Sequence, residues 1–506
     1  MADLERRRNE ELARILHQLG WNPERLAREV SLALPPGLAI SSTAPYKWRD
    51  RGMVPRSPHD QAVCEVLGRA LGIAVTYEQL WGRMGGNRGA KILSPNLLTD
   101  PWTADTAQTA LREAAADAGP VRLTDLFRGA DLDQAARRLA VPPPPVGGGE
   151  GALRIDPGLV GDLGHSHRSK QRLERAYGGG LVLGPARAEL ALVAKLLELG
   201  GYDEQLGRAL YGTAARFARL AGWAAYDLGH EAAAQRAFVA ALRAAHLSGE
   251  LRLGVGVVGC LVVLATQSTG GRGLDVRGLD AVGALSGALE AAGDALGPAD
   301  RAVQLGRIAR AHGRRGEPEE TRRAAERAFA ELDGLAGDAG EGVGGGAAGG
   351  VGGGALDGVA DGVADGVAGG VFDGAAGGVP GPVGRGSGAV SAAAGGHGTA
   401  VAGGVGELRA DLAGMVGEGY LFLGDHRRAQ SLLAGAVDGL GPGRARARAL
   451  LMVRLADSQR RTGRHREAAA TADRARALAA GMQSERVARA LRDFDAASRA
   501  GLPGEA

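Results

Sequence analysis

Apolar residues recur at helical spacing along most of the chain, and no segment shows a convincing strand pattern. Glycines and prolines separate these periodic segments, as turns between helices do. The longest apolar run, LGVGVVGCLVVLA at 253–265, is shorter than the roughly 18 residues that indicate a membrane span, so we expect a buried helix there. The pattern predicts an all-α protein.

Two stretches interrupt the helical pattern. The run VPPPPVGGGE at 141–150 cannot continue a helix and is expected to be a linker. Residues 334–406 hold 30 of the 85 glycines and almost no large side chains. Each glycine costs about 1 kcal/mol of helix propensity relative to alanine, and little apolar surface is available to offset ordering. We therefore predict a disordered Gly/Ala-rich insertion at 334–406, without stable helices.

The first 84 residues predict four or five short helices. Apolar spacing indicates one helix over 4–19 and a second that begins after Asn22, the expected N-cap, with Pro23 at its first position. A short polar helix is expected to begin near Thr43. A fourth covers SPHDQAVCEVLGRALG, and a last turn, TYEQLWG, closes the bundle.

The third of these helices is short and cationic. Trp48 and Ala44, four residues apart, form its expected buried side. We predict that its exposed side contacts DNA, because such a helix can reach base edges while neighbouring basic residues hold phosphates. The candidate DNA-binding residues are Ser42, Thr43, Tyr46, Lys47, Arg49, Arg51 and Arg56.

The string YKWRDRGMVPRSPHDQAVCEVLGRALG resembles the repressor-type (XRE-like) helix-turn-helix. More closely, LGWNPERLAREV and TAPYKWRDRGMVPR are similar to the N-termini of large actinobacterial regulators that carry a helical-repeat body, including negative regulators of streptomycete differentiation and antibiotic production. The resemblance implies transcriptional control of development or secondary metabolism. Two features differ from the repressor pattern: the stretch before Tyr46 is longer, and one extra residue separates Trp48 from Gly52.

Charge supports DNA binding only modestly. The whole chain has a net charge of +3, and residues 1–93 hold 14 Lys and Arg against 10 Asp and Glu, a net charge of +4. Phosphate binding favours more positive charge on one face. A second basic stretch, from Arg444 to Arg476, has 10 arginines against three acidic residues. It indicates either a solvated helix face or a surface for an acidic partner.

Four segments align on a glycine between two helices, at Gly229, Gly316, Gly424 and Gly463. A small residue stands seven positions before each glycine, and small or apolar residues stand five, nine and twelve positions after it. This spacing is that of tetratricopeptide (TPR) repeats, in which small residues let paired helices approach closely. The predicted packing residues are Gly222, Gly229, Ala234, Phe238, Ala241, Gly417, Tyr420, Gly424, Ala429, Ala436, Gly463, Ala468 and Ala475.

The predicted organisation follows from these segments. It comprises an XRE-like helix-turn-helix domain at 1–84, a helical connector at 85–150, TPR-like repeats at 151–333, the disordered insertion at 334–406 and further TPR-like repeats at 407–506.

Residues for catalysis are missing from the sequence. It has no P-loop, GxSxG or HExxH motif. His165 and His167 are too sparse for a metal site, and the two cysteines, Cys64 and Cys260, are expected in the core. We expect no enzyme activity, catalytic residue, metal or cofactor. The charged N-terminus lacks the apolar segment of a signal peptide, and the low cysteine content fits a reducing cytoplasm.

The preferred hypothesis is a cytoplasmic transcriptional regulator with no membrane association. Its first domain binds double-stranded DNA, and its TPR body binds a protein or peptide or joins copies of the chain into a homo-oligomer. The alternative is a TPR adaptor that acts through protein contacts alone. Binding to duplex DNA that weakens steeply with added salt would separate the two.

Overall fold

The computed structural model describes most of the chain. The described residues are 8–34, 38–56, 58–71, 75, 77–81, 101–116, 129–147, 153–267, 281–341 and 396–500. Their regular structure is helical, as predicted, apart from one parallel pair of two-residue strands, β1 (Leu153–Arg154) and β2 (Gly200–Gly201). The chain forms two compact units, of which the first contains residues 1–100 and the second contains most of the remainder.

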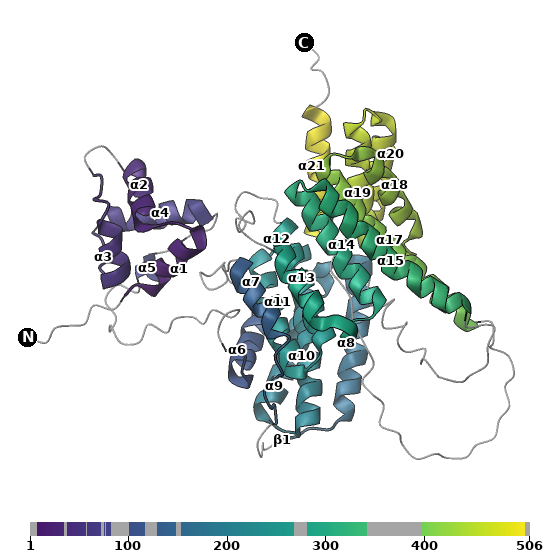
Figure 1. Ribbon diagram of the computed structural model, residues 1–506, viewed down its shortest axis with the longest axis horizontal. Helices are drawn as coiled ribbons and strands as arrows, with labels where there is room; N and C mark the ends of the chain where they lie inside the picture. Colours follow the sequence, from purple (N-terminus) through teal and green to yellow (C-terminus); the bar gives the residue numbers. More distant parts are fainter. Residues whose placement is uncertain are drawn as a thin grey trace, which may run out of the picture. The chain divides into compact units, whose positions relative to one another are not determined.

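The first unit contains a bundle of short helices (Figure 1). They are α1 (Glu10–Leu19), α2 (Pro23–Ala33), α3 (Ala44–Arg51), α4 (His59–Leu71) and α5 (Tyr77–Trp81). The Asn22 side chain accepts a hydrogen bond from the backbone N–H of Arg25 at 2.8 Å, which confirms the predicted cap of the second helix. Asn9 caps α1 in the same way, so that helix begins later than the apolar spacing indicated.

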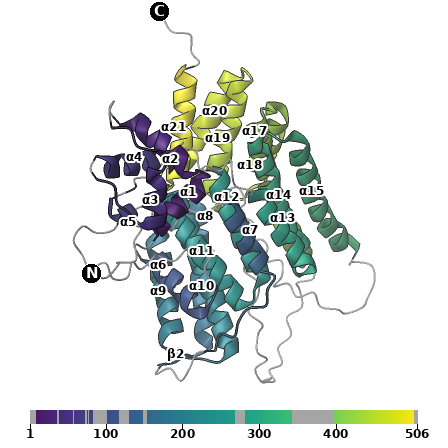
Figure 2. The ribbon, with the colours of Figure 1, turned by 60° about the vertical axis from the view of Figure 1, so that its left-hand side comes forward.

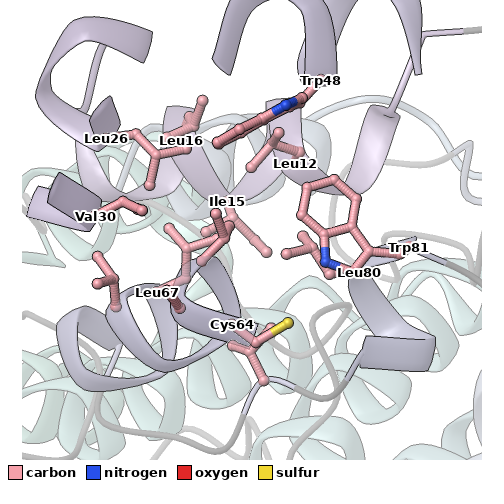
Figure 3. Close-up of a cluster of buried hydrophobic side chains, with 14 of the residues drawn as sticks. Leu12, Ile15, Leu16, Leu26, Val30, Trp48, Cys64, Leu67, Leu80 and Trp81 are labelled. Carbon is pink, nitrogen blue, oxygen red and sulfur yellow. The ribbon is translucent and has the colours of Figure 1, made fainter. Parts of the chain in front are cut away.

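All five helices contribute to one apolar core (Figure 3). Trp48 of α3 and Trp81 of α5 meet edge to face, with ring centroids 6.3 Å apart. The Asn9 amide also donates to the carbonyl oxygen of Leu80 at 2.9 Å, which ties the start of α1 to α5. Helices this short are marginal in isolation, so their stability depends on the shared core.

The second unit, called the body below, is built on four helical hairpins (Figures 1 and 2). They pair α10 (Glu204–Asp227) with α11 (Glu231–Ser248), α14 (Pro298–Arg315) with α15 (Pro318–Glu341), α17 (Gly396–Leu423) with α18 (His426–Gly439), and α19 (Ala445–Arg461) with α20 (His465–Ala479). The four aligned glycines occupy the turns, and each has a φ of 78° or 80°. This left-handed conformation favours glycine. The helical-repeat fold is thereby confirmed.

Further helices flank the hairpins. They are α6 (Ala104–Ala115), α7 (Gly129–Arg138), α8 (Gly158–Tyr177), α9 (Leu183–Leu199), α12 (Leu251–Gln267), α13 (Ala281–Ala292) and α21 (Glu485–Ala500), with the 3₁₀ turns η2 (Gly179–Leu181), η4 (Gly293–Ala295) and η6 (Pro442–Arg444). The longest apolar run lies in α12 and is buried, as predicted. Among the described helices, none is both long and apolar enough to cross a membrane.

Helices extend into both ends of the insertion predicted at 334–406. Helix α15 continues to Glu341, and α17 already begins at Gly396. Extending an existing helix adds one hydrogen bond per residue without a new nucleation step, so glycines next to a packed helix can be included in it. Residues 342–395, at the centre of the predicted insertion, lie outside the described residues, as does the predicted boundary at residue 84.

The last hairpin packs against the first helices of the body. Helix α8 contacts α9 and α10 and also contacts α19 and η6. Arg446 Nη2 of α19 lies 2.7 Å from Glu174 Oε1 of α8, and its Nη1 lies 3.4 Å from Asp227 Oδ1 of α10. The Ser484 hydroxyl donates to the same Asp227 oxygen at 2.7 Å. We call these four residues the Arg446 cluster.

The arginine-rich stretch beginning at Arg444 is therefore not simply a solvated helix face. Arg444 pairs with Asp411 at 2.8 Å, and both side chains are at most 4% exposed. Arg446 is also buried. Other arginines of this stretch form more exposed pairs: Arg461 with Asp457 of its own helix, and Arg464, just before α20, with Glu467 of that helix. The two buried arginines join helices within the body, so they are not available to an external acidic partner.

Candidate nucleic-acid interface

Helix α3 carries most of the candidate DNA-binding residues. It ends at Arg51 and is followed by Gly52, which has a φ of 59° and donates its N–H to the carbonyl oxygen of Lys47. Trp48 is buried with 6% of its surface exposed, and Ala44 packs against the same core, as predicted for the inward side. The exposed candidates are Ser42, Thr43, Lys47, Arg51 and Arg56, whereas Tyr46 and Arg49 are half-buried.

Tyr46 and Arg49 are fixed by neighbouring side chains. The Tyr46 hydroxyl donates to Glu24 Oε1 of α2 at 2.5 Å. This hydrogen bond lowers the pKa of Glu24 and raises the pKa of Tyr46. The Arg49 guanidinium lies over the Tyr46 ring, 5.1 Å from its centroid, and donates two hydrogen bonds to Asp50 at 2.7 and 2.9 Å. The charge of Arg49 is thus largely compensated within the bundle.

Lys47, Arg51 and Arg56 keep their positive charges uncompensated. Their side chains are exposed and form no ion pair or hydrogen bond with any other described residue. Lys47 and Arg51 are four residues apart, so they project from the same side of α3. Exposed arginine and lysine side chains with this freedom are suited to phosphate oxygens. Arg28 of α2 is likewise exposed, although it was not among the predicted residues.

The bond between Glu24 and Tyr46 was not predicted from the sequence. The two residues lie on different helices, and no periodicity or motif marks them as partners. A second contact that no sequence pattern indicates is a cation–π contact: the Arg25 guanidinium lies over the Trp21 ring, 4.8 Å from its centroid. The first contact joins α2 to α3, and the second holds Arg25 of α2 against the residue that precedes the cap of its own helix.

Histidines and cysteines singled out in the sequence occupy structural positions. His167 is buried with its ring edge against Phe217, at a centroid distance of 5.4 Å. His165 is exposed and bonds the carbonyl oxygen of Gly161. Burial raises the pKa of the Cys64 thiol to about 11, which disfavours the reactive thiolate. In the part of the chain that is described, no three His, Cys, Asp or Glu side chains are placed to hold a metal ion.

The chain is thus an all-α protein in which a small helical bundle accompanies a helical-repeat body. Residues 12–81, which run from within α1 to the end of α5, match the sequence profile of the SP15 N-terminal domain. The match coincides with the bundle that carries the candidate interface. No curated protein and no solved structure matches the chain.

Proposed function

We propose that the chain is a cytoplasmic transcriptional regulator whose N-terminal bundle binds double-stranded DNA and whose body, a TPR-type array, binds a protein or peptide. The observation that carries the proposal is the exposed, uncompensated pair Lys47 and Arg51 on a helix held from behind by Trp48. The resemblance of this segment to actinobacterial regulators supports control of development or secondary metabolism. The body is also a candidate surface for joining copies of the chain.

We infer different tasks for the candidate residues. Lys47 and Arg51 would contribute most of the attraction to phosphate, because their charges are free. Arg49 is held by Asp50, and Tyr46 is held by Glu24. These two side chains would present a fixed polar surface to a groove of the DNA. Fixed side chains lose little rotamer entropy on binding, which favours them for base contacts.

The test measures binding of the full-length protein to pooled genomic duplex fragments at two salt concentrations. We expect affinity to fall with added salt, and the variant Lys47→Ala with Arg51→Ala to lower the slope of log K against log salt by about 2, or about 1 per phosphate contact. The control, Arg323→Ala with Arg327→Ala, removes the same charge from exposed positions of the body and should leave the slope unchanged.

Equal binding by the Lys47/Arg51 variant would contradict the proposed interface. Absence of DNA binding by the unchanged protein would contradict DNA recognition altogether. The second candidate function, an adaptor, would then be favoured. Its specific support is the modest positive charge of residues 1–93, where 14 Lys and Arg stand against 10 Asp and Glu. An adaptor would retain its protein partner in a pull-down with the Lys47/Arg51 variant.

A further inference from the structure

The turns of the last three hairpins lie next to one another along one edge of the body. The Arg314 guanidinium, at the end of α14, lies over the Phe422 ring of the third hairpin, 4.9 Å from its centroid. Gln430 of α18 donates to the Thr462 hydroxyl at 3.0 Å and so ties the third turn to the fourth. We call these neighbouring segments the turn edge, which comprises residues 312–317, 424–428 and 457–467.

The turn edge carries a surplus of positive charge. It contains eight arginines and four acidic residues, a net charge of +4. Each acid already has a basic partner within the edge: Glu317 pairs with Arg315, Asp425 with Arg428, Asp457 with both Arg460 and Arg461, and Glu467 with Arg464. The next acids along α15, Glu319 and Glu320, pair with Arg322 and Arg323 of the same helix. The surplus is therefore not cancelled by the neighbouring acids.

Three arginines, one from each turn, carry this surplus. Arg314, Arg427 and Arg466 are exposed and form no ion pair with any other described residue. Arg427 and Arg466 each stand three positions after their turn glycine, so they occupy equivalent places in successive hairpins. We call these three residues the arginine strip. The hairpin repeat thus presents free guanidinium groups one after another along the same edge.

The surroundings of the arginine strip favour phosphate over a protein as the binding partner. None of the exposed large apolar side chains among the described residues lies in the turn edge. Protein interfaces depend on buried aromatic and apolar anchors at their centre. Contacts to the phosphates of DNA need only charged or polar donors, and they do not depend on base sequence. A regularly charged backbone therefore fits this edge better than a protein surface does.

We propose that the arginine strip is a second, sequence-independent contact with the backbone phosphates of the duplex that the bundle binds. The inference rests on the proposed DNA-binding function and extends it to the body. Linking two binding sites in one chain raises the effective concentration of the second, so contacts too weak to bind DNA alone contribute once the first site is bound. The strip ends at the second hairpin, because the first turn carries Glu231 and has Glu485 beside Gly229.

The experiment measures binding of the full-length protein to two mixed-sequence duplexes, of about one and about four helical turns. The test variant combines Arg314→Gln, Arg427→Gln and Arg466→Gln. For the longer duplex it should lower the slope of log K against log salt by about 3, or about 1 per lost phosphate contact. For the shorter duplex the slope should not change, because the DNA held by the bundle leaves no length for the strip.

Two further variants serve as controls. Arg327→Gln, Arg474→Gln and Arg489→Gln together remove the same charge from exposed arginines outside the turn edge and should leave both slopes unchanged. Lysine at the three strip positions should keep most of the slope, because a phosphate attracts any positive charge. Circular dichroism establishes that all the variants remain helical.

The proposal is overturned if the strip variant and the unchanged protein have the same slope on the longer duplex, or if the control variant loses as much. Polyglutamate is the probe for the alternative, an acidic protein, and tighter binding of polyglutamate than of a duplex of equal charge would also contradict the proposal. The Lys47/Arg51 variant separates the two DNA contacts. A loss in that variant with none in the strip variant contradicts the strip alone, and the reverse result contradicts only the interface proposed on the bundle. Absence of DNA binding by the unchanged protein contradicts both.

Discussion

Gly222 lies directly against the ring of Phe238, so that a Cβ atom added at Gly222 would stand 2.5 Å from Cε1 of that ring. The same relationship recurs in the third hairpin, where a Cβ at Gly417 would stand 2.9 Å from Cγ of Leu433. At the equivalent positions of the other two hairpins, both residues are small and buried: Ala309 and Ala325, and Ala456 and Ala472. The two positions thus share one limited volume, and glycine is present where its partner is large.

Gly222→Ala should destabilise the protein by about 1–3 kcal/mol, the usual cost of overpacking a rigid core. Phe238 is fully buried in a close-packed core, so its ring has little room to shift. In a Phe238→Ala background, the same substitution should be neutral or stabilising, because the added methyl group then fills vacated space. Urea denaturation of the four proteins of this double-mutant cycle measures the coupling.

Gly435→Ala is the matched control for that cycle. Gly435 lies within α18, and no atom lies within 4 Å of a Cβ placed there. Replacing this glycine should stabilise the helix by up to about 1 kcal/mol. Equal effects at Gly222 and Gly435 would show that helix propensity, and not the Phe238 contact, determines the cost.

Gly463→Ala should cost about 1–2 kcal/mol through backbone conformation alone. The residue has a φ of 80°, and a Cβ atom added at this position would meet no other atom within 4 Å. Gly463→Asn should cost less, because asparagine tolerates the left-handed region better than alanine. Thermal unfolding of the two variants compares them, and a smaller loss for alanine would contradict the conformational explanation.

Arg446→Met should destabilise the body by about 3–5 kcal/mol, because it leaves buried carboxylates without their cation. The Arg446, Glu174 and Asp227 side chains are at most 3% exposed. Arg476→Met provides the comparison: this side chain is 41% exposed, and its pairs with Asp473 and Asp495 lie on the surface. Its loss should cost less than about 1 kcal/mol. Similar costs for both variants in chemical denaturation would argue against a structural role for the Arg446 cluster.

Stability should depend on pH through Asp300 and Asp411. Burial raises the pKa of each carboxyl to about 7, against the opposing effects of Arg252 and Arg444. In unfolded chains the pKa of Asp is about 3.9. At a pH between these two values, the Asp300 and Asp411 carboxyls are protonated in the folded state and ionised in the unfolded state. The free energy of unfolding should therefore fall as the pH rises from about 4 to about 7.

Urea denaturation at pH 5 and pH 7.5 tests this dependence. Asp300→Asn removes one of the two titrating groups, so its stability should fall less over that interval than the stability of the unchanged protein. Asp333→Asn, at an exposed position, should leave the pH dependence unaltered. A parallel decline in all three proteins would assign the effect to other groups.

Local patterns predicted the helices and turns of this protein better than its long-range contacts. The four turn glycines were found because each satisfies a local backbone requirement and recurs at a fixed distance from small residues. Asn22 was found as a helix cap for a similar reason. By contrast, Arg446 and Glu174 lie far apart in the sequence, and only the fold brings them together.

The candidate interface likewise has features that local patterns predicted and features that they did not. The burial of Trp48 and the exposure of Lys47 follow from helical spacing and agree with the prediction. The compensation of Arg49 by Asp50, with the Tyr46 ring beneath it, depends on side-chain conformations that no sequence pattern specifies. The DNA-binding roles of these residues remain predictions.

The contacts of α8 also restrict how chains of this fold can change in length. In a linear repeat array each unit contacts only its neighbours, so a unit added at an end disturbs no other contact. Here Gln483, beyond the last hairpin, exchanges backbone hydrogen bonds with Tyr177 and Gly180, at the end of α8. Inserting or deleting a hairpin would displace one side of that junction from the other. The junction therefore disfavours changes in the number of hairpins.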